Sequence, residues 1–361
     1  MSLSAQPIRF DMRKMIIPRM FLAMMLPCAM LTLSCEKTQC ELCSQEGELR
    51  HVTVGLGADA VVTKVRGVTS FQENVVRNCR LYVFTQQGYQ INNWSAEDGI
   101  FDLYLTDGVY DFVAVANLDG LPGTEASRED LFALRVPIEK NTTDPGTGGF
   151  VMVGRLENHV IRDDEKITVE VRRLVSKVSY TVRSAFESHM ASYPFVVDEI
   201  YMTNVVGDND LGLSRSLQPA EGVWYNKMNY DAAAAAAGPY PAGMLHGDFA
   251  KQMASGDSLV SGHTFYVYPN ASEDRRDTTS WSPRCTRMVV RAHLNGIQTY
   301  YAVTLNTQNQ GVLPNKHYHV DLTVKGWGSD HPEIETVDQG AITGVFSVED
   351  WQEGAVISPI F

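Results

Sequence analysis

Apolar and polar residues alternate with a period of two along most of the chain beyond about residue 50. In residues 317–325 the apolar positions are Tyr318, Val320, Leu322 and Val324, and the positions between them are polar. Such alternation is typical of a β-strand with one face in a core and one face in water. Segment 165–172 shows the same alternation, so strands are predicted in both halves of the chain.

Short strands separated by turns account for nearly all of this pattern, and Gly88, Gly99 and Gly108 occupy predicted turns. In the first half the predicted strands are His51–Leu56, Cys79–Thr85, Ile100–Leu105, Val109–Asn117, Leu131–Ile138, Phe150–Leu156 and Glu165–Arg172. In the second half they are 174–182, Phe195–Val206, His263–Tyr268, 288–294, 301–305, 318–324 and Ala341–Asp350. The only helices predicted are Glu129–Leu134 and Asp231–Ala237.

Seven or so strands in each half, without long helices between them, predict an all-β protein of two tandem antiparallel β-sandwiches. A length of 361 residues agrees with two domains of about 150 residues each. The N-terminal sandwich is expected at 51–172 and the C-terminal sandwich at 173–361. Residues 207–261 form a predicted long loop insertion, since connections have a median of about 4–6 residues. The pattern excludes a βαβ nucleotide-binding fold.

The first fifty residues are expected to be a targeting region rather than part of the fold. Basic residues precede an apolar run from Met20 to Leu33, and Cys35 follows that run. We interpret 1–35 as a signal peptide with Cys35 as the lipidation site, and 36–50 as a polar tether. Thr32 departs from the usual lipobox leucine, so an ordinary cleaved signal is the alternative. Translation starting at Met12 or Met15 would fit equally well.

Composition excludes two classes of protein. Charged residues make up 20% and hydrophobic residues 44% of the chain, which is the composition of a globular protein rather than a disordered one. The formal net charge of -13 would repel a phosphate backbone, so nucleic acid is not an expected partner. Beyond the signal and Cys35, four cysteines remain, an even number that suits an oxidising compartment. They are Cys40, Cys43, Cys79 and Cys285.

Candidate catalytic and binding motifs are weak. His317, His319 and Asp321 share one strand face with the spacing of metal ligands, but solvent-facing polar positions explain them more simply. The run 208–210 begins like a calcium loop and is interpreted as an Asx-rich turn. Nucleophile-elbow, phosphate-loop and zinc-protease motifs are absent from the sequence. We therefore predict no enzyme, no cofactor and no metal. Trp224 and nearby tyrosines would have to form an exposed platform for a glycan-binding alternative.

Several short motifs, ordered along the chain, resemble the fimbrillin family, the lipoprotein-derived subunits of type V pili. The motifs are Arg80-Leu-Tyr-Val-Phe84, Tyr110-Asp-Phe-Val-Ala114, Arg173-Leu-Val-Ser-Lys-Val178, Thr264-Phe-Tyr-Val-Tyr-Pro-Asn270, Asn315-Lys-His-Tyr-His-Val-Asp-Leu-Thr323 and Val348-Glu-Asp-Trp351. The resemblance implies transthyretin-like sandwiches and a structural role in a surface filament that supports adhesion. It also implies an outer membrane lipoprotein precursor that is located at the cell surface.

The resemblance further implies processing by an arginine-specific protease. Lys64-Val-Arg66-Gly67 follows an extended apolar segment, as the cleavage site of stalk and tip subunits does, so Arg66 is the predicted maturation site. A stalk or tip subunit is favoured over an anchor subunit, because the segment after Cys35 lacks the Tyr/Asp/Asn-rich sequence of anchors. A membrane-anchoring subunit and a surface glycan-binding lipoprotein remain the alternatives.

The two ends of the chain predict how subunits would join. Cleavage at Arg66 would remove the strand that holds Val52, Val54 and Leu56, the predicted acceptor positions for strand exchange. The apolar tail 355–361 would then fill the groove of the next subunit and give a head-to-tail polymer. The predicted donor residues are Val356, Ile357, Ile360 and Phe361. The alternative is that the tail folds back as an edge strand of its own second domain. Other fimbrial subunits are therefore the expected partners, besides a host or bacterial surface ligand.

Overall fold

The computed structural model describes the chain from Gly47 to Trp351 with internal gaps. The described residues are 47–57, 61–62, 73–124, 126–141, 149–213, 223–226, 246–260, 263–273, 283–306, 310–332 and 342–351. Residues 47–361 form one compact unit, and 1–46 form a second unit that lies outside the described ranges. Among the described residues, no helix has the length and apolar composition to cross a membrane.

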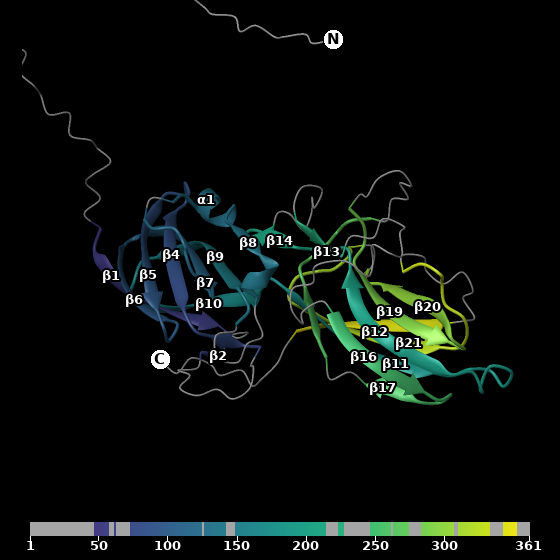
Figure 1. The fold of residues 1–361 in the computed structure, drawn as a ribbon. Coiled ribbons are helices and arrows are strands. Elements are labelled where there is room, and N and C mark those ends of the chain that lie inside the picture. The colour runs from purple at the N-terminus through teal and green to yellow at the C-terminus, as the bar shows by residue number, and fades with distance from the viewer. Residues whose placement is uncertain are drawn as a thin grey trace, which may run out of the picture. The chain divides into compact units, whose positions relative to one another are not determined.

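Strands from the first half of the chain form a seven-stranded sheet (Figure 1). Its order is β5 (Gln90–Ala96), β4 (Cys79–Thr85), β7 (Gly108–Ala116), β9 (Met152–Ile161), β10 (Glu165–Arg173), β1 (Leu49–Gly57) and β6 (Ile100–Thr106). In β10 the side chains of Ile167, Val169 and Val171 are buried and those between them are exposed or half-buried. The alternation that predicted this strand therefore also sets which face enters the core.

Strand β10 changes partner along its length. Residues 165–170 pair in parallel with β1, and residues 171–173 pair in antiparallel with β9. Gly154 of β9 lies against this change of partner, because a Cβ atom there would lie 2.4 Å from the backbone oxygen of Glu170. Only a residue without a side chain fits such a close approach of two backbones. Through this crossing, β1 and β6 join the sheet that holds β9 and β7.

Strands from the second half form two further sheets. One contains β17 (Ser258–Val260), β11 (Ser176–Ser184), β21 (Lys316–Val324) and β22 (Ile342–Asp350), with β18 (Phe265–Val267) also pairing to β11. The other contains β16 (His246–Met253), β12 (Phe195–Thr203), β19 (Arg287–Leu294) and β20 (Ile297–Thr304). The tight turn between β19 and β20 uses Asn295 and Gly296, both with positive φ, as a two-residue hairpin requires. Inward rows of both sheets belong to one hydrophobic core that continues into the first half.

Small elements connect these sheets. Three two-stranded sheets pair β13 (Val205–Val206) with β15 (Trp224–Tyr225), β14 (Asp208–Asp210) with β8 (Arg135–Pro137), and β2 (Val61–Val62) with β3 (Val75–Val76). A 3-10 turn, η2 (Ile138–Lys140), follows β8, and the one α-helix of the described residues is α1 (Arg128–Phe132). Helix α1 begins at a capping box, in which Ser127 and Asp130 exchange hydrogen bonds between side chain and backbone.

The all-β prediction is confirmed, with several local corrections. Strand bounds agree within a few residues for most predicted segments, and they coincide at Cys79–Thr85. Leu131 was included in two predictions, a helix over Glu129–Leu134 and a strand over Leu131–Ile138. The helix is confirmed as α1, and the strand prediction was wrong at its start. Three pairings are parallel, between β1 and β10, β11 and β21, and β2 and β3, whereas the other pairings of the described strands are antiparallel, as expected. The described parts of 207–261 contain the strands β14, β15, β16 and β17, which belong to four different sheets, rather than loop alone. The predicted helix Asp231–Ala237 lies outside the described residues.

The domain boundary near 172–174 stays a prediction. Every strand of the seven-stranded sheet precedes Leu174, and every strand of the two other large sheets follows it. The β8 and β14 pair nevertheless joins the two halves, since Val136 of the first half is in register with Asn209 of the second. Tyr268 adds a hydrogen bond from its hydroxyl to the Val136 carbonyl, at 3.1 Å.

Candidate functional site

Strand β1 occupies an interior position of the first sheet, between β10 and β6. It pairs in antiparallel with β6, from Leu49 opposite Thr106 to Gly55 opposite Ile100. On its other edge, residues 52–57 pair in parallel with 165–170. Neighbouring strands lie about 4.8 Å apart, so without β1 the edges of β6 and β10 would face each other across roughly 10 Å of unpaired backbone.

The three predicted acceptor residues all point into the core. Val52, Val54 and Leu56 are 0%, 0% and 5% exposed. They pack in the same apolar cluster as Phe101 of β6 and Val169 of β10. Burial of an aliphatic side chain of this size contributes about 1.5–3 kcal/mol, so the row contributes roughly 5–9 kcal/mol to holding β1 in place.

Polar contacts of β1 add little to this. Thr53 donates a hydrogen bond to the carboxylate of Asp102 at 3.0 Å, and Arg50 pairs with Asp107 at 2.8 Å. That hydrogen bond from Arg50 holds the pKa of Asp107 below its usual value. These groups are exposed or partly exposed to water, where ion pairs contribute little to stability. Strand β1 is therefore held by apolar burial and by its backbone pairings on both edges.

The covalent link between β1 and the rest of the sheet runs through residues 58–72. Of this link the structure describes β2, which pairs with β3 just after Glu73. Arg66, the predicted maturation site, lies outside the described residues. So do Cys35 and the predicted donor residues Val356, Ile357, Ile360 and Phe361.

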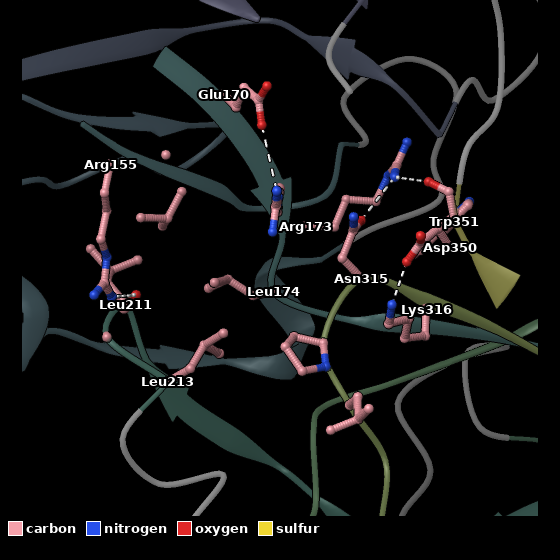
Figure 2. A pocket seen from close by; sticks show the side chains of 16 residues that line it. Arg155, Glu170, Arg173, Leu174, Leu211, Leu213, Asn315, Lys316, Asp350 and Trp351 are labelled. Carbon is pink, nitrogen blue, oxygen red and sulfur yellow. Dashed lines mark hydrogen bonds and ion pairs between the residues drawn. The ribbon is translucent and has the colours of Figure 1, made fainter. Parts of the chain in front are cut away.

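A crevice of about 940 Å³ lies beside β9 and β10, where the link between the two halves begins (Figure 2). Its charged lining residues are mostly occupied by neighbours: Lys316 pairs with Asp350, and Arg155 lies 4.0 Å from the centre of the Phe132 ring. Burial lowers the pKa of Arg155. The lining residues include no histidine, serine, threonine or cysteine.

The histidine pair of β21 forms a hydrogen-bonded ladder with β11. Ser179 lies 2.8 Å from a ring nitrogen of His317 and 2.8 Å from one of His319, while Asp321 pairs with Arg183. Within the described ranges, no group of three or more His, Cys, Asp or Glu side chains is arranged to hold a metal ion. His317, His319 and Asp321 are half-buried, as expected for polar strand positions.

Asp208–Asp210 is a strand and not the Asx-rich turn that we predicted. It is β14, which pairs with β8, and Asp208 forms an ion pair with Arg135. Beside it, Tyr225 donates a hydrogen bond to Glu139, and burial raises the pKa of Tyr225 to about 12. The strand forms because β8 offers an exposed ladder edge, which short-range sequence signals do not report.

Trp224 does not form an aromatic platform, because it is only 7% exposed and packs in the core from β15. Of the nearby tyrosines, Tyr225 is half-buried, and Tyr230 and Tyr240 lie outside the described residues. Cys79 and Cys285 are buried, and burial raises the pKa of Cys79 to about 12. A glycan-binding surface built on Trp224 is therefore not supported by its position.

Sequence reasoning missed one buried polar cluster. Glu73, Arg173 and Lys177 meet Trp351 at the point where the two halves join. Lone charged residues next to strand ends usually face solvent, so the sequence carried no local signal for their burial. In the sequence, Arg173 and Trp351 stand out only as members of the fimbrillin-like motifs.

Comparison with known proteins places these features in a family context. A family model described as fimbrillin-A associated anchor proteins Mfa1 and Mfa2 matches residues 57–214. No curated protein matches the chain. A candidate cell adhesion protein from Bacteroides eggerthii has a similar fold, with a TM-score of 0.56 at 16% identity over 84% of this chain and 97% of that one.

Two structures from Porphyromonas gingivalis are similar to the same extent. A fimbrilin gives a TM-score of 0.55 at 15% identity, covering 83% of this chain and 98% of its own. The tip fimbrial protein Mfa3, with a C-terminal truncation, gives 0.51 at 13% identity, covering 84% and 100%. At these identities the likeness establishes the fold. Together with the family model, it confirms the predicted resemblance to the fimbrillins and points to a non-enzymatic protein.

Proposed function

We propose that the chain is a structural subunit of a cell-surface fimbria, assembled head to tail by strand exchange and supporting adhesion. The observation that carries this proposal is the interior position of β1, whose buried row is Val52, Val54 and Leu56. Fimbrial and adhesion proteins share the fold, and the family model is named for fimbrial proteins. A subunit that can lose an interior strand has a ready acceptor for a strand of another subunit.

Processing would release this strand and so open the acceptor groove that it fills. In the proposal the precursor is exported as an outer membrane lipoprotein through Cys35 and is then cut after Arg66. The cut leaves β1 with no covalent link to β3, so only its pairings and its buried row retain it. Loss of β1 exposes two ladder edges and an apolar groove, a state that needs a replacement strand.

The replacement strand would come from the C-terminal segment of another copy or of a related fimbrial subunit. Val356, Ile357, Ile360 and Phe361 supply the apolar side chains, and the segment 355–361 carries no charged side chain. Donor and acceptor are different surfaces of the subunit, so the contact repeats as a filament rather than closing a dimer.

We propose a stalk or tip position for this subunit, with a membrane-anchoring subunit as the alternative. The basic site at Arg66, in the link after an apolar strand, supports the stalk or tip position. The description of the family model names anchor proteins, which supports the alternative. The N-terminus of the mature protein separates the two: a free amine after Arg66 fits a stalk or tip, and a lipid on Cys35 fits an anchor.

The assembly proposal is tested by electron microscopy of purified precursor treated with an arginine-specific protease. We expect filaments from the wild-type chain. An Arg66→Ala variant and a chain lacking 355–361 should both remain soluble monomers. Filaments formed by the truncated chain would show that the tail is not the donor. Fatty-acid labelling of wild type and Cys35→Ala tests the lipid separately, since label on the variant would exclude Cys35 as the modified residue.

A further inference from the structure

The buried cluster missed by sequence analysis joins two chain positions that flank the proposed assembly segments. Glu73 is the first described residue after the link that contains Arg66, and Trp351 is the last described residue before 352–361. We infer that Glu73 is a positioning residue: it fixes Trp351, and so the origin of the C-terminal segment, to the start of the processed chain. This inference rests on the proposed function.

The side chain of Glu73 binds groups from three elements of the second half. Its carboxylate accepts a hydrogen bond from the Trp351 indole Nε1 at 3.0 Å and one from Lys177 Nζ at 3.0 Å. The Tyr266 hydroxyl donates to the other carboxylate oxygen. Lys177 lies on β11, Tyr266 on β18, and Trp351 directly after β22. One carboxylate from the first half therefore ties together three segments of the second half.

Arg173 donates hydrogen bonds to the backbone carbonyls of both Glu73 and Trp351. Its Nε donates to the carbonyl of Glu73 at 3.1 Å, and its Nη1 donates to the carbonyl of Trp351 at 3.2 Å and to Asn315 Oδ1 at 3.1 Å. The guanidinium carbon also lies 4.2 Å from the centre of the indole ring. Figure 2 shows Arg173 beside Asn315 and Trp351 at one end of the crevice. Trp351 is thus held through its ring, its N–H and its carbonyl.

Burial makes these contacts strong. Arg173 and Trp351 are each 1% exposed, and the side chains of Glu73 and Lys177 are 10% and 13% exposed. Phe150 covers the cluster, with its ring centre 4.6 Å from that of Tyr266 and 5.4 Å from that of Trp351. With little water present, hydrogen bonds between charged partners are less screened, and the loss of one partner leaves the other buried without compensation.

The cluster lies on the retained side of the proposed cut. Glu73 comes seven positions after Arg66, and β1 lies before the link, so cleavage leaves Glu73 and its contacts with the processed chain. At the other end, pulling on a donated C-terminal segment would reach the folded domain first at Trp351. Contacts to Arg173 of β10 and Lys177 of β11 then pass that force into strands of both halves. The cluster so determines where the donor segment leaves the subunit.

Glu73→Gln in the full-length precursor tests this directly, with Glu97→Gln as a matched control on an exposed glutamate. Glutamine keeps the size of the side chain and removes its charge. By hydrogen-exchange mass spectrometry we expect about tenfold or more faster exchange in 73–76 and in 342–351, with β19 and β20 unchanged. Unchanged exchange in 342–351, as in the control, would overturn the inference.

Trp351→Phe provides a second variant that keeps the aromatic packing and removes only the N–H donor. Combined with Glu73→Gln, it should cost less than the sum of the two single changes, because both act on the hydrogen bond between Glu73 and the indole N–H. Additive effects on exchange in 342–351 would contradict a direct link between the two residues. This pair keeps the test informative if a larger change, such as Glu73→Ala, prevents folding.

Filament assays separate this inference from the proposed function. Processed Glu73→Gln should assemble more slowly than processed wild type, while Glu97→Gln should match wild type. Normal assembly of Glu73→Gln, despite faster exchange at 342–351, would overturn the positioning role. If wild type itself forms no filament while the exchange effect is present, the proposed function fails and the fixing of Trp351 by Glu73 stands.

Discussion

Replacement of a single valine on β1 tests how that strand is held. Val54 is 0% exposed and lies opposite Ile167 of β10 and Phe101 of β6. Val54→Ala removes two buried carbons, each worth about 0.8 kcal/mol in transfer from water, and leaves a cavity that adds to the loss. We expect the free energy of unfolding to fall by about 2–3 kcal/mol.

Thr53→Ala is the matched control, because Thr53 lies on the same strand with its side chain on the opposite face. Its hydroxyl donates to the exposed carboxylate of Asp102, so its loss should cost only about 0.5 kcal/mol. Urea unfolding of the full-length protein, followed by tryptophan fluorescence, measures both changes. The m value, which is the dependence of the unfolding free energy on urea concentration, should be the same for both variants and wild type. Equal losses for the two variants would refute the claim that the buried row holds β1.

A second measurement connects this loss to the release of β1. A protease site inserted between Val62 and Glu73 would cut the link without relying on Arg66. Mass spectrometry of the fraction eluting with the folded protein would then follow the β1 peptide over time. The peptide should leave the Val54→Ala protein at least about tenfold faster than wild type, since 1.4 kcal/mol corresponds to a factor of ten. Equal release from wild type and Val54→Ala would place the retention elsewhere.

Three further predictions concern other parts of the fold. With its pKa raised to about 12, Cys79 should resist iodoacetamide at pH 8 in native protein and react after unfolding in urea, and peptide mapping that finds native labelling would contradict its burial. Arg50 lowers the pKa of Asp107 below its ordinary 3.8, so the ion pair stabilises the protein above that pH and loses its effect as the pH falls through the lowered pKa. Urea midpoints of wild type and Asp107→Asn should therefore converge below about pH 4, and divergence on acidification would show the opposite sign. Gly154→Ala should lower the free energy of unfolding by about 1–3 kcal/mol, because its Cβ would meet the Glu170 backbone, and a loss under about 0.5 kcal/mol in urea titration would show that β9 can move away.

Strands with one solvent-exposed face were predictable, because apolar residues alternate along the sequence with the same period of two as buried side chains along a strand. In β21, Tyr318, Val320, Leu322 and Val324 are all buried, and the residues between them are half-buried. The strand β5 was missed because its sequence, QINNWSA, is mostly polar and does not alternate. It is an end strand of its sheet with one paired edge, so the ladder with β4 forms it rather than any buried row of its own.

The helix α1 illustrates a second limit. Leu131 fits both a strand and a helical pattern, and local periodicity over so few residues does not separate them. The reciprocal hydrogen bonds of Ser127 and Asp130 decide in favour of the helix. The helix predicted over Glu129–Leu134 is therefore the one that forms, and the strand begins only at Arg135.

In the candidate site too, features set by neighbouring residues were predictable from the sequence, and features set by distant residues were not. The sequence alone predicted the buried row of β1, because the alternation of Val52, Val54 and Leu56 with other residues shows that they share one face of the strand. It did not say that this row lies between two partners, since the β10 partner of Val52 is Glu165, more than a hundred residues later. A strand at the edge of a sheet and a strand in its interior have the same local pattern. Removal of an edge strand leaves a narrower sheet, whereas removal of an interior strand leaves a gap between two unpaired strand edges. The capacity to accept a foreign strand is therefore a property of the topology, and the same holds for Glu73, whose role depends on the distant Trp351.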